Sequence, residues 1–335
     1  MSFHSICNWL TSRTFLVSLM VGLWLPTSPV AQTSFDWLND AVHPGGMALA
    51  NASVAAANPA EALNLNPAGL RWLPSTSSPA RTFQLSLCRY PARISQLMTQ
   101  IILPSDTKVV GVEIRRFNYG TFHGYDEDGL RQEDYTAADI LLRGGMMRRM
   151  GKYLAVGATA GILSSRLEDA TALAVLWSLG LQLEVTPLAT RLGAVVLNRG
   201  RFITQYGNTR PDNLPATWLV GLAKPLAHLP LTLYISAGKN TATGQSLWRL
   251  GGEFRLPRRL ALRLGVDQGK LDYRRGNTYA DLLSGLSLGF GTRSAGTANP
   301  SAKGLKRFTG FSLDGAVKFA GPLGFSSSFA LGLKF

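Results

Sequence analysis

Side chains that could carry out acid–base or nucleophilic chemistry are few and widely separated in this chain of 335 residues. After residue 31 the histidines are His43, His123 and His228, and none stands beside an obvious nucleophile. Cys88 is the only cysteine of that region, which excludes an internal disulfide and a cysteine-based metal cluster. We therefore expect no enzyme activity, no cofactor and no metal.

A more distinctive pattern predicts a positional role. It consists of a glycine pair followed, after 19 residues, by an Asn-Pro turn: Gly45, Gly46, Asn66, Pro67, Ala68, Gly69 and Leu70. An Asn-Pro pair starts a turn, a glycine allows close backbone approach, and a leucine can anchor in a wall pocket. The surrounding region 32–80 is rich in Ala, Asn and Pro, and its helical stretch 48–62 is interrupted at Asn58-Pro59. We expect a hatch inside or beneath the rest of the protein; the alternative is a disordered leader.

Residues 81–335 must position that hatch, and they alternate between apolar and polar or small side chains. From Trp177 to Val185, for example, every odd position is large and apolar. The opposite face carries polar residues, which suit a wet lumen: Gln182, Glu184, Arg259, Arg263 and Asp267. We predict fourteen strands near 82–90, 92–103, 107–117, 137–147, 153–163, 173–184, 190–199, 216–224, 231–239, 246–256, 260–269, 282–292, 308–319 and 324–335.

The last predicted strand alternates most clearly and ends on an aromatic residue. Its outward face carries Phe329, Leu331, Leu333 and Phe335, whereas the intervening residues are small or charged. We expect this strand to close a barrel against strand 82–90. In outer-membrane barrels generally, such a strand resembles the element that the barrel-assembly machinery recognises, so we also expect these four residues to act as an insertion signal.

Composition agrees with a membrane barrel. Charged residues make up only 16% of the chain, and 35 glycines ease strand curvature, the interpretation given to Gly144-Gly145 and Gly251-Gly252. Outside the N-terminus no run of about 18 apolar residues could form a spanning helix. The fold class is therefore an all-β, transmembrane antiparallel β-barrel of about 14 strands with a short N-terminal hatch. We expect a signal peptide over 1–31, cleaved near Ala31, then the hatch over 32–80 and the barrel over 81–335.

The lengths of the predicted connections assign the two sides of the membrane. Short connections mark the periplasmic side and longer ones the exterior, so an acidic loop at 118–136 and a basic loop at 200–215 face outward. Aromatic residues near strand ends predict interfacial girdles: Phe117, Tyr119, Tyr153, Trp177, Trp218, Trp248, Phe319 and Phe335. The net charge of +14 is then balanced by anionic lipid or an acidic protein, and not by nucleic acid.

The glycine pair and the Asn66–Leu70 run resemble the N-terminal region of FadL-like outer-membrane barrels, which have fourteen strands and a hatch. Longer segments resemble the PorV/PorQ branch of that superfamily, on its PorQ side: FDWL at 35–38, VGVEIRRFNYG at 110–120, the segment 122–139, and LP at 214–215 followed by VGLAKPLA at 220–227. Members of that branch commonly carry acidic residues between the two hatch elements, where this chain has only Glu61.

The resemblance implies a non-catalytic outer-membrane component of type IX protein secretion and cell-surface attachment. Its implied partners are outer-membrane lipid, a PorV-like barrel and a sortase-like surface enzyme. The alternative is a FadL-like transporter of hydrophobic compounds, which would need an apolar path through the lumen. The polar residues expected on the inward face argue against that alternative.

Overall fold

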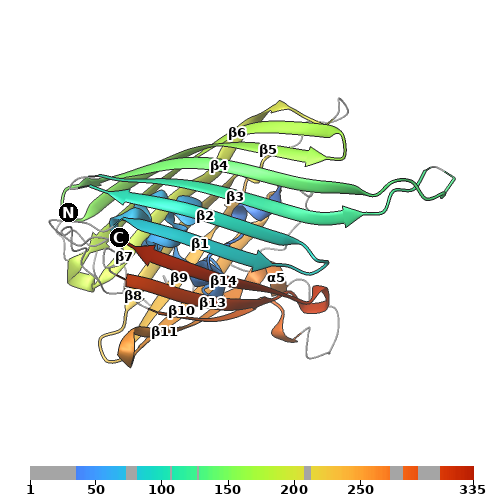
Figure 1. Ribbon diagram of the computed structural model, residues 1–335. Coiled ribbons are helices and arrows are strands. Elements are labelled where there is room, and N and C mark those ends of the chain that lie inside the picture. Colours follow the sequence, from blue (N-terminus) through green and yellow to red (C-terminus); the bar gives the residue numbers. More distant parts are fainter. Residues whose placement is uncertain are drawn as a thin grey trace. The chain divides into compact units, whose positions relative to one another are not determined.

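The computed structural model describes residues 35–72, 81–105, 108–126, 128–206, 213–271, 282–292 and 310–335. The expected signal peptide, residues 1–31, lies outside these ranges. Within them, fourteen antiparallel strands form a closed barrel (Figure 1). The strands are β1 (Thr82–Arg89), β2 (Ser95–Pro104), β3 (Lys108–Phe122), β4 (Tyr135–Met150), β5 (Leu154–Leu167), β6 (Ala170–Val185), β7 (Thr190–Thr204), β8 (Thr217–Pro225), β9 (Leu231–Asn240), β10 (Ser246–Leu256), β11 (Leu260–Asp267), β12 (Leu286–Thr292), β13 (Gly310–Phe319) and β14 (Phe325–Lys334).

Each strand pairs with its neighbours in sequence, and the barrel closes between β14 and β1, as predicted. The alternating pattern places large apolar side chains outward: Leu179 and Leu181 of β6, for example, remain 52% and 42% exposed. In a membrane barrel these positions face lipid. Of the final strand, Phe329, Leu331 and Leu333 take outward positions, and the backbone of Phe335 pairs with Arg81 beyond β1.

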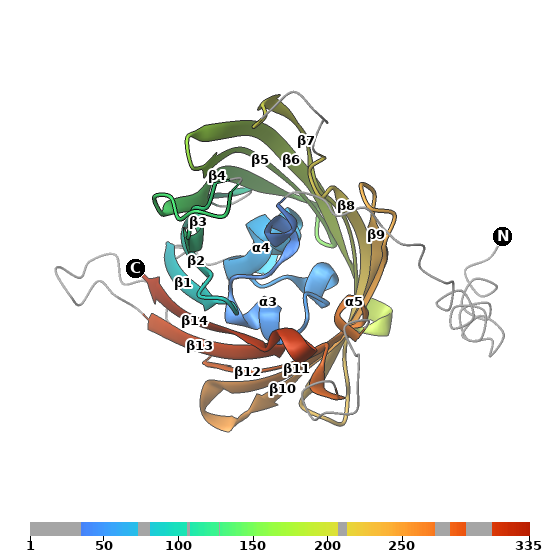
Figure 2. The same cartoon turned by 90° about the vertical axis from the view of Figure 1, so that its right-hand side faces the viewer.

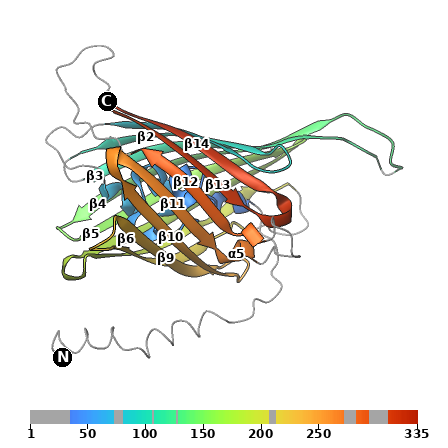
Figure 3. The same cartoon turned by 90° about the horizontal axis from the view of Figure 1, so that it is seen from below.

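The wall is much taller on one side than on the other. Strands β3 to β7, here called the tall wall, have 14 to 16 residues each. The remaining strands, here called the short wall, have 7 to 11 residues. Figures 1 and 3 show the β3–β4 hairpin projecting well past the other strands. We call this end of the barrel external, and the end with the short turns after β2, β4, β6, β8 and β10 periplasmic.

The sequence located all fourteen strands but made those of the tall wall too short. The expected loop 164–172 is continuous strand with a turn of only two residues between Leu167 and Ala170. Arg201, expected in the basic loop 200–215, likewise belongs to β7, as does Arg199 at the expected end of that strand. Conversely, Arg259 lies in a turn after β10 and not on the lumen face of a strand.

The hatch, residues 35–72, fills the lumen with short helical turns (Figure 2). They are η1 (Asp36–Asn39), α3 (Pro44–Ala48), η2 (Ser53–Ala56), α4 (Pro59–Leu65) and η3 (Pro67–Trp72). Asn58-Pro59 starts α4 instead of interrupting a helix: Asn58 is its N-cap and Pro59 its first residue, where a missing N–H costs nothing. None of the described helices is long and apolar enough to cross a membrane.

Candidate functional site: the hatch and the mouth cavity

Inward-facing glycines of the wall make the room that the hatch occupies. A Cβ atom on Gly157 would lie 2.4 Å from the carbonyl carbon of Pro67, and one on Gly265 would lie 2.5 Å from that of Leu49. Among the described residues, nine such glycines on nine different strands face the hatch: Gly111, Gly145, Gly157, Gly180, Gly193, Gly221, Gly251, Gly265 and Gly289. The expectation that Gly145 and Gly251 serve strand curvature is therefore incomplete, because they admit Leu63 and Leu49 of the hatch.

The Asn66–Leu70 run docks on the inner face of the tall wall. The Asn66 side chain accepts from the Ala68 N–H (3.1 Å) and donates to the carbonyls of Val54 (2.8 Å) and Leu181 (3.2 Å). Pro67 lies against Gly157, as described above. A side chain on Gly69 would lie 2.8 Å from the Ala57 carbonyl oxygen, which explains the glycine by close approach. Leu70 is fully buried against wall residues that include Met147 and Ala155.

The glycine pair Gly45-Gly46 lies in α3 and has a polar neighbourhood. The N–H of Gly45 donates to Nδ1 of His43 (3.0 Å), the N-cap of this helix. A Cβ atom on Gly46 would lie 2.2 Å from Oε2 of Glu61. The other carboxylate oxygen of Glu61 accepts from the Asn58 N–H (3.0 Å) and the Ser53 hydroxyl (3.3 Å). Glu61 thus joins three hatch segments, and any larger residue at Gly46 would displace it.

Both titratable side chains in this part of the hatch favour their neutral forms. Burial raises the pKa of the Glu61 carboxyl to about 7, although the hydrogen bond from Asn58 and the nearby charge of Arg263 act in the opposite direction. Burial also lowers the pKa of the His43 imidazole to about 4, so the ring is neutral at neutral pH and Nδ1 can accept from Gly45.

Hydrogen bonds tie the start of the hatch to Asp139 on the tall wall. Its carboxylate accepts from Trp37 Nε1 (2.7 Å), from the Tyr119 hydroxyl (2.8 Å) and from the Ser165 hydroxyl. Trp37 also stacks on Phe117, with ring centroids 5.2 Å apart. Phe117 and Tyr119 therefore face the lumen and do not belong to the lipid girdle expected from the sequence.

Two fully buried arginines complete the attachment to the tall wall. Arg115 donates to the Asn64 side chain (2.5 Å) and to the carbonyls of Trp37 (3.2 Å) and Asp40 (3.3 Å). Arg143 donates to the Leu63 carbonyl (3.0 Å) and to Asn198. These polar lumen residues contact the hatch and not an open wet channel, and sequence alternation alone could not distinguish the two.

On the short wall a cavity of about 510 Å³ lies between the hatch and the external turns. Its size is within the range of small-molecule sites. Most of its surface is apolar, and its polar side chains include Asp40, Asn51, Lys318 and Ser326. The ammonium of Lys318 lies 3.3 Å from Asp267 Oδ2 and 4.0 Å from Asp40 Oδ1. We call it the mouth cavity, and it is lined by Asp40, Ala41, Met47, Ala50, Asn51, Tyr90, Pro91, Ala92, Ile94, Lys318, Ala320, Leu323 and Ser326. No sequence signal pointed to it, because turns far apart in the chain enclose it.

The remaining candidates for chemistry are not brought together. His123 pairs with Asp134 in the exposed β3–β4 hairpin, His228 is exposed in the turn before β9, and Cys88 is buried as a free thiol. Over the described part of the chain, no three His, Cys, Asp or Glu side chains are placed to hold a metal ion.

Comparison with known proteins places the fold. No protein-family model and no curated protein matches the sequence. Among solved structures, the toluene transporter TodX of Pseudomonas putida is similar, with a TM-score of 0.51 and 14% identity over 86% of this chain and 96% of TodX. A second TodX structure gives 0.53 and 13% over 89% and 97%, and the monoaromatic hydrocarbon channel CymD gives 0.51 and 14% over 88% and 96%. The chain therefore has the fold of FadL-like outer-membrane barrels: a closed, fourteen-stranded wall with a helical N-terminal segment.

Proposed function

We propose that this protein is an outer-membrane channel for small hydrophobic compounds, and that the mouth cavity is where such a compound first binds. The cavity supports this proposal most directly: it is half-enclosed, mostly apolar and placed at the external end of the lumen. The structural neighbours TodX and CymD, which carry toluene and monoaromatic hydrocarbons, favour the same class of cargo.

The floor of the mouth cavity is the part of the hatch best suited to move. Residues Ala41 to Asn51 form this floor, and α3 within it packs on the short wall through small residues such as Ala48 against Gly289 and Ala316. By contrast, buried hydrogen bonds hold η1 and α4 to the tall wall: Trp37 donates to Asp139, and Arg143 donates to the Leu63 carbonyl. Passage of a compound would then require displacement of α3 only, with the rest of the hatch retained.

Two serines on β14 allow a matched test. Ser326 lines the mouth cavity, whereas Ser327 takes the outward position next to it. Ser326→Phe should fill the cavity and lower uptake of labelled toluene or decanoate into proteoliposomes at least five-fold. Ser327→Phe adds the same ring on the lipid side and should leave uptake unchanged. Equal rates for the two variants, or a wild-type rate no higher than that of empty liposomes, would refute the channel.

A second candidate function follows from the projecting β3–β4 hairpin and from the resemblance to the PorV/PorQ branch: a scaffold for type IX secretion that binds a PorV-like barrel or a sortase-like enzyme. The hairpin is ordered beyond the wall. Asp126 accepts from the N–H groups of Asp128 (3.1 Å) and Leu130 (2.8 Å), and Phe122 stacks on Tyr135 at 5.4 Å. An ordered, charged projection is a suitable surface for a protein partner.

Charge reversal tests the scaffold without disturbing the turn. The side chains of Asp128 and Glu133 are exposed on the hairpin, and those of Asp126 and Asp134 should be kept because they order it. Asp128→Lys with Glu133→Lys should reduce recovery of surface partners in a pull-down, whereas Asp169→Lys in the β5–β6 turn should not. Unchanged recovery would remove the hairpin as a docking surface.

A further inference from the structure

Charged side chains of the wall are sorted by sign between its two faces. On the described strands, every aspartate and glutamate points into the lumen: Glu113, Asp139, Glu184, Glu253, Asp267 and Asp314. The charged side chains on the outward face of the same strands are all cations. Toward the external end they are Arg89, Arg116, Arg166, Arg199, Arg201 and Lys239. A lipid-facing surface with cations and no carboxylates requires its counter-charge from outside the protein.

Arg199 and Arg201 form the densest point of this outward charge. They occupy alternate positions on β7, so their side chains leave the strand about 7 Å apart. Arg199 lies opposite Trp177 on β6, and Arg201 lies opposite Val175. Nine residues of β7 separate Arg199 from the periplasmic end, which is roughly 20 Å along the membrane normal for a strand tilted by about 40°. Both arginines therefore lie near the external boundary of the apolar band.

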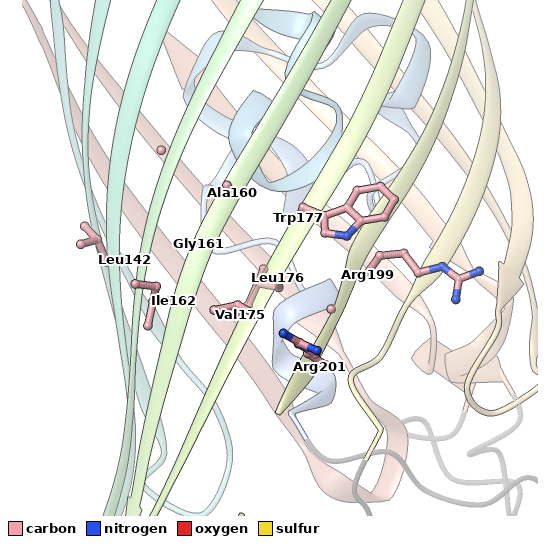
Figure 4. A pocket seen from close by; sticks show the side chains of 11 residues that line it. Leu142, Ala160, Gly161, Ile162, Val175, Leu176, Trp177, Arg199 and Arg201 are labelled. Carbon is pink, nitrogen blue, oxygen red and sulfur yellow. The ribbon is translucent and has the colours of Figure 1, made fainter. Parts of the chain in front are cut away.

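A hollow in the outer wall adjoins the two arginines (Figure 4). Its volume is about 970 Å³, and its rim is formed by Leu142, Ile162, Trp177 and the two arginines. The floor lies below this rim because Gly144, Ala160 and Gly200 present little or no side chain. A Cβ atom on Gly144 would meet nothing within 4 Å, which confirms open space outside this strand. We call this feature the outer hollow.

We propose that the outer hollow binds a phosphorylated glycolipid of the outer leaflet, with a phosphate between Arg199 and Arg201 and an acyl chain over Gly144 and Ala160. Three observations agree on this occupant. Guanidinium groups pair with phosphate through several hydrogen bonds. The apolar floor accepts hydrocarbon, and Trp177 is a residue type that favours the boundary between headgroup and chain. No described carboxylate on the outward face competes for the two arginines. This site is independent of what the lumen carries.

The test is lipid retention by the purified full-length protein, measured by native mass spectrometry after incubation with phosphorylated lipid A. Arg199→Gln with Arg201→Gln should lower bound lipid A at least ten-fold, and the double lysine variant should retain most of it. Gly144→Leu fills the hollow without a clash and should lower retention about five-fold. Gly252→Leu, at an outward position on β10, should have no effect.

Two further arms identify the source of binding. Arg148→Gln removes an outward cation at the periplasmic end of β4 and should leave lipid A retention unchanged. Wild-type protein should retain dephosphorylated lipid A only as weakly as the double glutamine variant retains phosphorylated lipid A. Equal retention by wild type and the double glutamine variant would overturn the proposal, provided both show the heat-modifiable migration of a folded barrel. The proposal would also be overturned if wild-type protein retained phosphatidylglycerol as well as lipid A and if Arg148→Gln lowered that retention as much as the double glutamine variant does.

Discussion

The tall wall and the short wall hold the same hatch in different ways. On the tall wall, Asp139, Arg115 and Arg143 bind the hatch through buried, charge-assisted hydrogen bonds. On the short wall, α3 meets glycine and alanine, the hydrogen bonds to the hatch come from neutral side chains such as Ser328 and Gln100, and beyond α3 lies the mouth cavity. Hydrogen bonds to charged groups are roughly twice as strong as those between neutral groups, so the contacts on the short wall are more easily separated. The comparison indicates that the hatch is anchored on one side and movable on the other.

The largest effect is expected from removing Asp139, which anchors the hatch to the tall wall. Asp139→Ala removes the charged acceptor of Trp37 in the hatch and of Tyr119 and Ser165 in the wall, and it should weaken docking of residues 35–40 by up to about 3 kcal/mol. Hydrogen exchange of those amides measures it. Asp314→Ala is the short-wall counterpart: its carboxylate pairs with Arg263, which keeps Glu253 as a partner. If both variants release residues 35–40 equally, the tall wall is not a special anchor.

The second effect is a pH dependence at Glu61, which lies between the two sides. The pKa of about 7 in the docked hatch is above the ordinary value of 4.5, so the docked state binds the proton more tightly. This contribution is complete below about pH 4.5 and is lost as the pH rises through about 7, a change of roughly 3 kcal/mol. The protection factors of the α3 amides, which correct for the pH dependence of intrinsic exchange, should therefore fall between pH 5 and pH 8. Glu61→Gln should flatten that profile, and a profile unchanged in the variant would rule out Glu61 as its source.

A smaller effect should follow from filling the wall on the anchored side. Gly157→Val places methyl groups against the Pro67 and Ala68 backbone and should cost about 1–3 kcal/mol of hatch docking. Ala158→Val also introduces a valine, on the lipid face of β5. Single-channel conductance in planar bilayers should rise for the first variant only. Closed channels in both variants would show that the hatch stays docked on the tall wall despite the side chain added at Gly157.

The smallest effect on stability concerns the strand that closes the short wall. Phe335→Ala keeps the backbone pair with Arg81 and should change unfolding of the finished barrel by less than about 1 kcal/mol. If the ring belongs to the insertion signal, the amount of inserted protein should fall several-fold. Phe311→Ala, an exposed aromatic of the neighbouring strand, serves as control. Normal surface levels of the Phe335 variant would remove the signal from this residue.

The two walls also differ in how far the sequence could predict them. Short-wall strands lie within the membrane band, where one face must be apolar, so alternation located β8, β9 and β10 to within a residue or two. Tall-wall strands continue past the band, and there both faces become polar, as at Ser164, Ser165 and Arg166 of β5. The pattern stops at the lipid boundary although the hydrogen-bonded ladder continues.

The site was predictable in part for a related reason. Asn66 and Gly69 act locally, by a side-chain turn and a close approach, and local sequence shows both. The mouth cavity and the Asp139 cluster depend on residues more than a hundred positions apart, such as Trp37 and Asp139. The outer hollow was concealed because the predicted strand ended at Arg199 and placed Arg201 in a loop, whereas β7 continues to Thr204.

The inward-facing glycines of the wall determine how permeable the barrel would be without its hatch. At the level of the hatch, nine strands present bare backbone toward the axis, so the cylinder has no interior packing of its own there. A chain shortened to begin at β1 would enclose water where the intact protein is solid, and its permeability would be set by the wall diameter alone. Loss of the residues before β1 would thus convert a closed barrel into a pore, without altering a single strand.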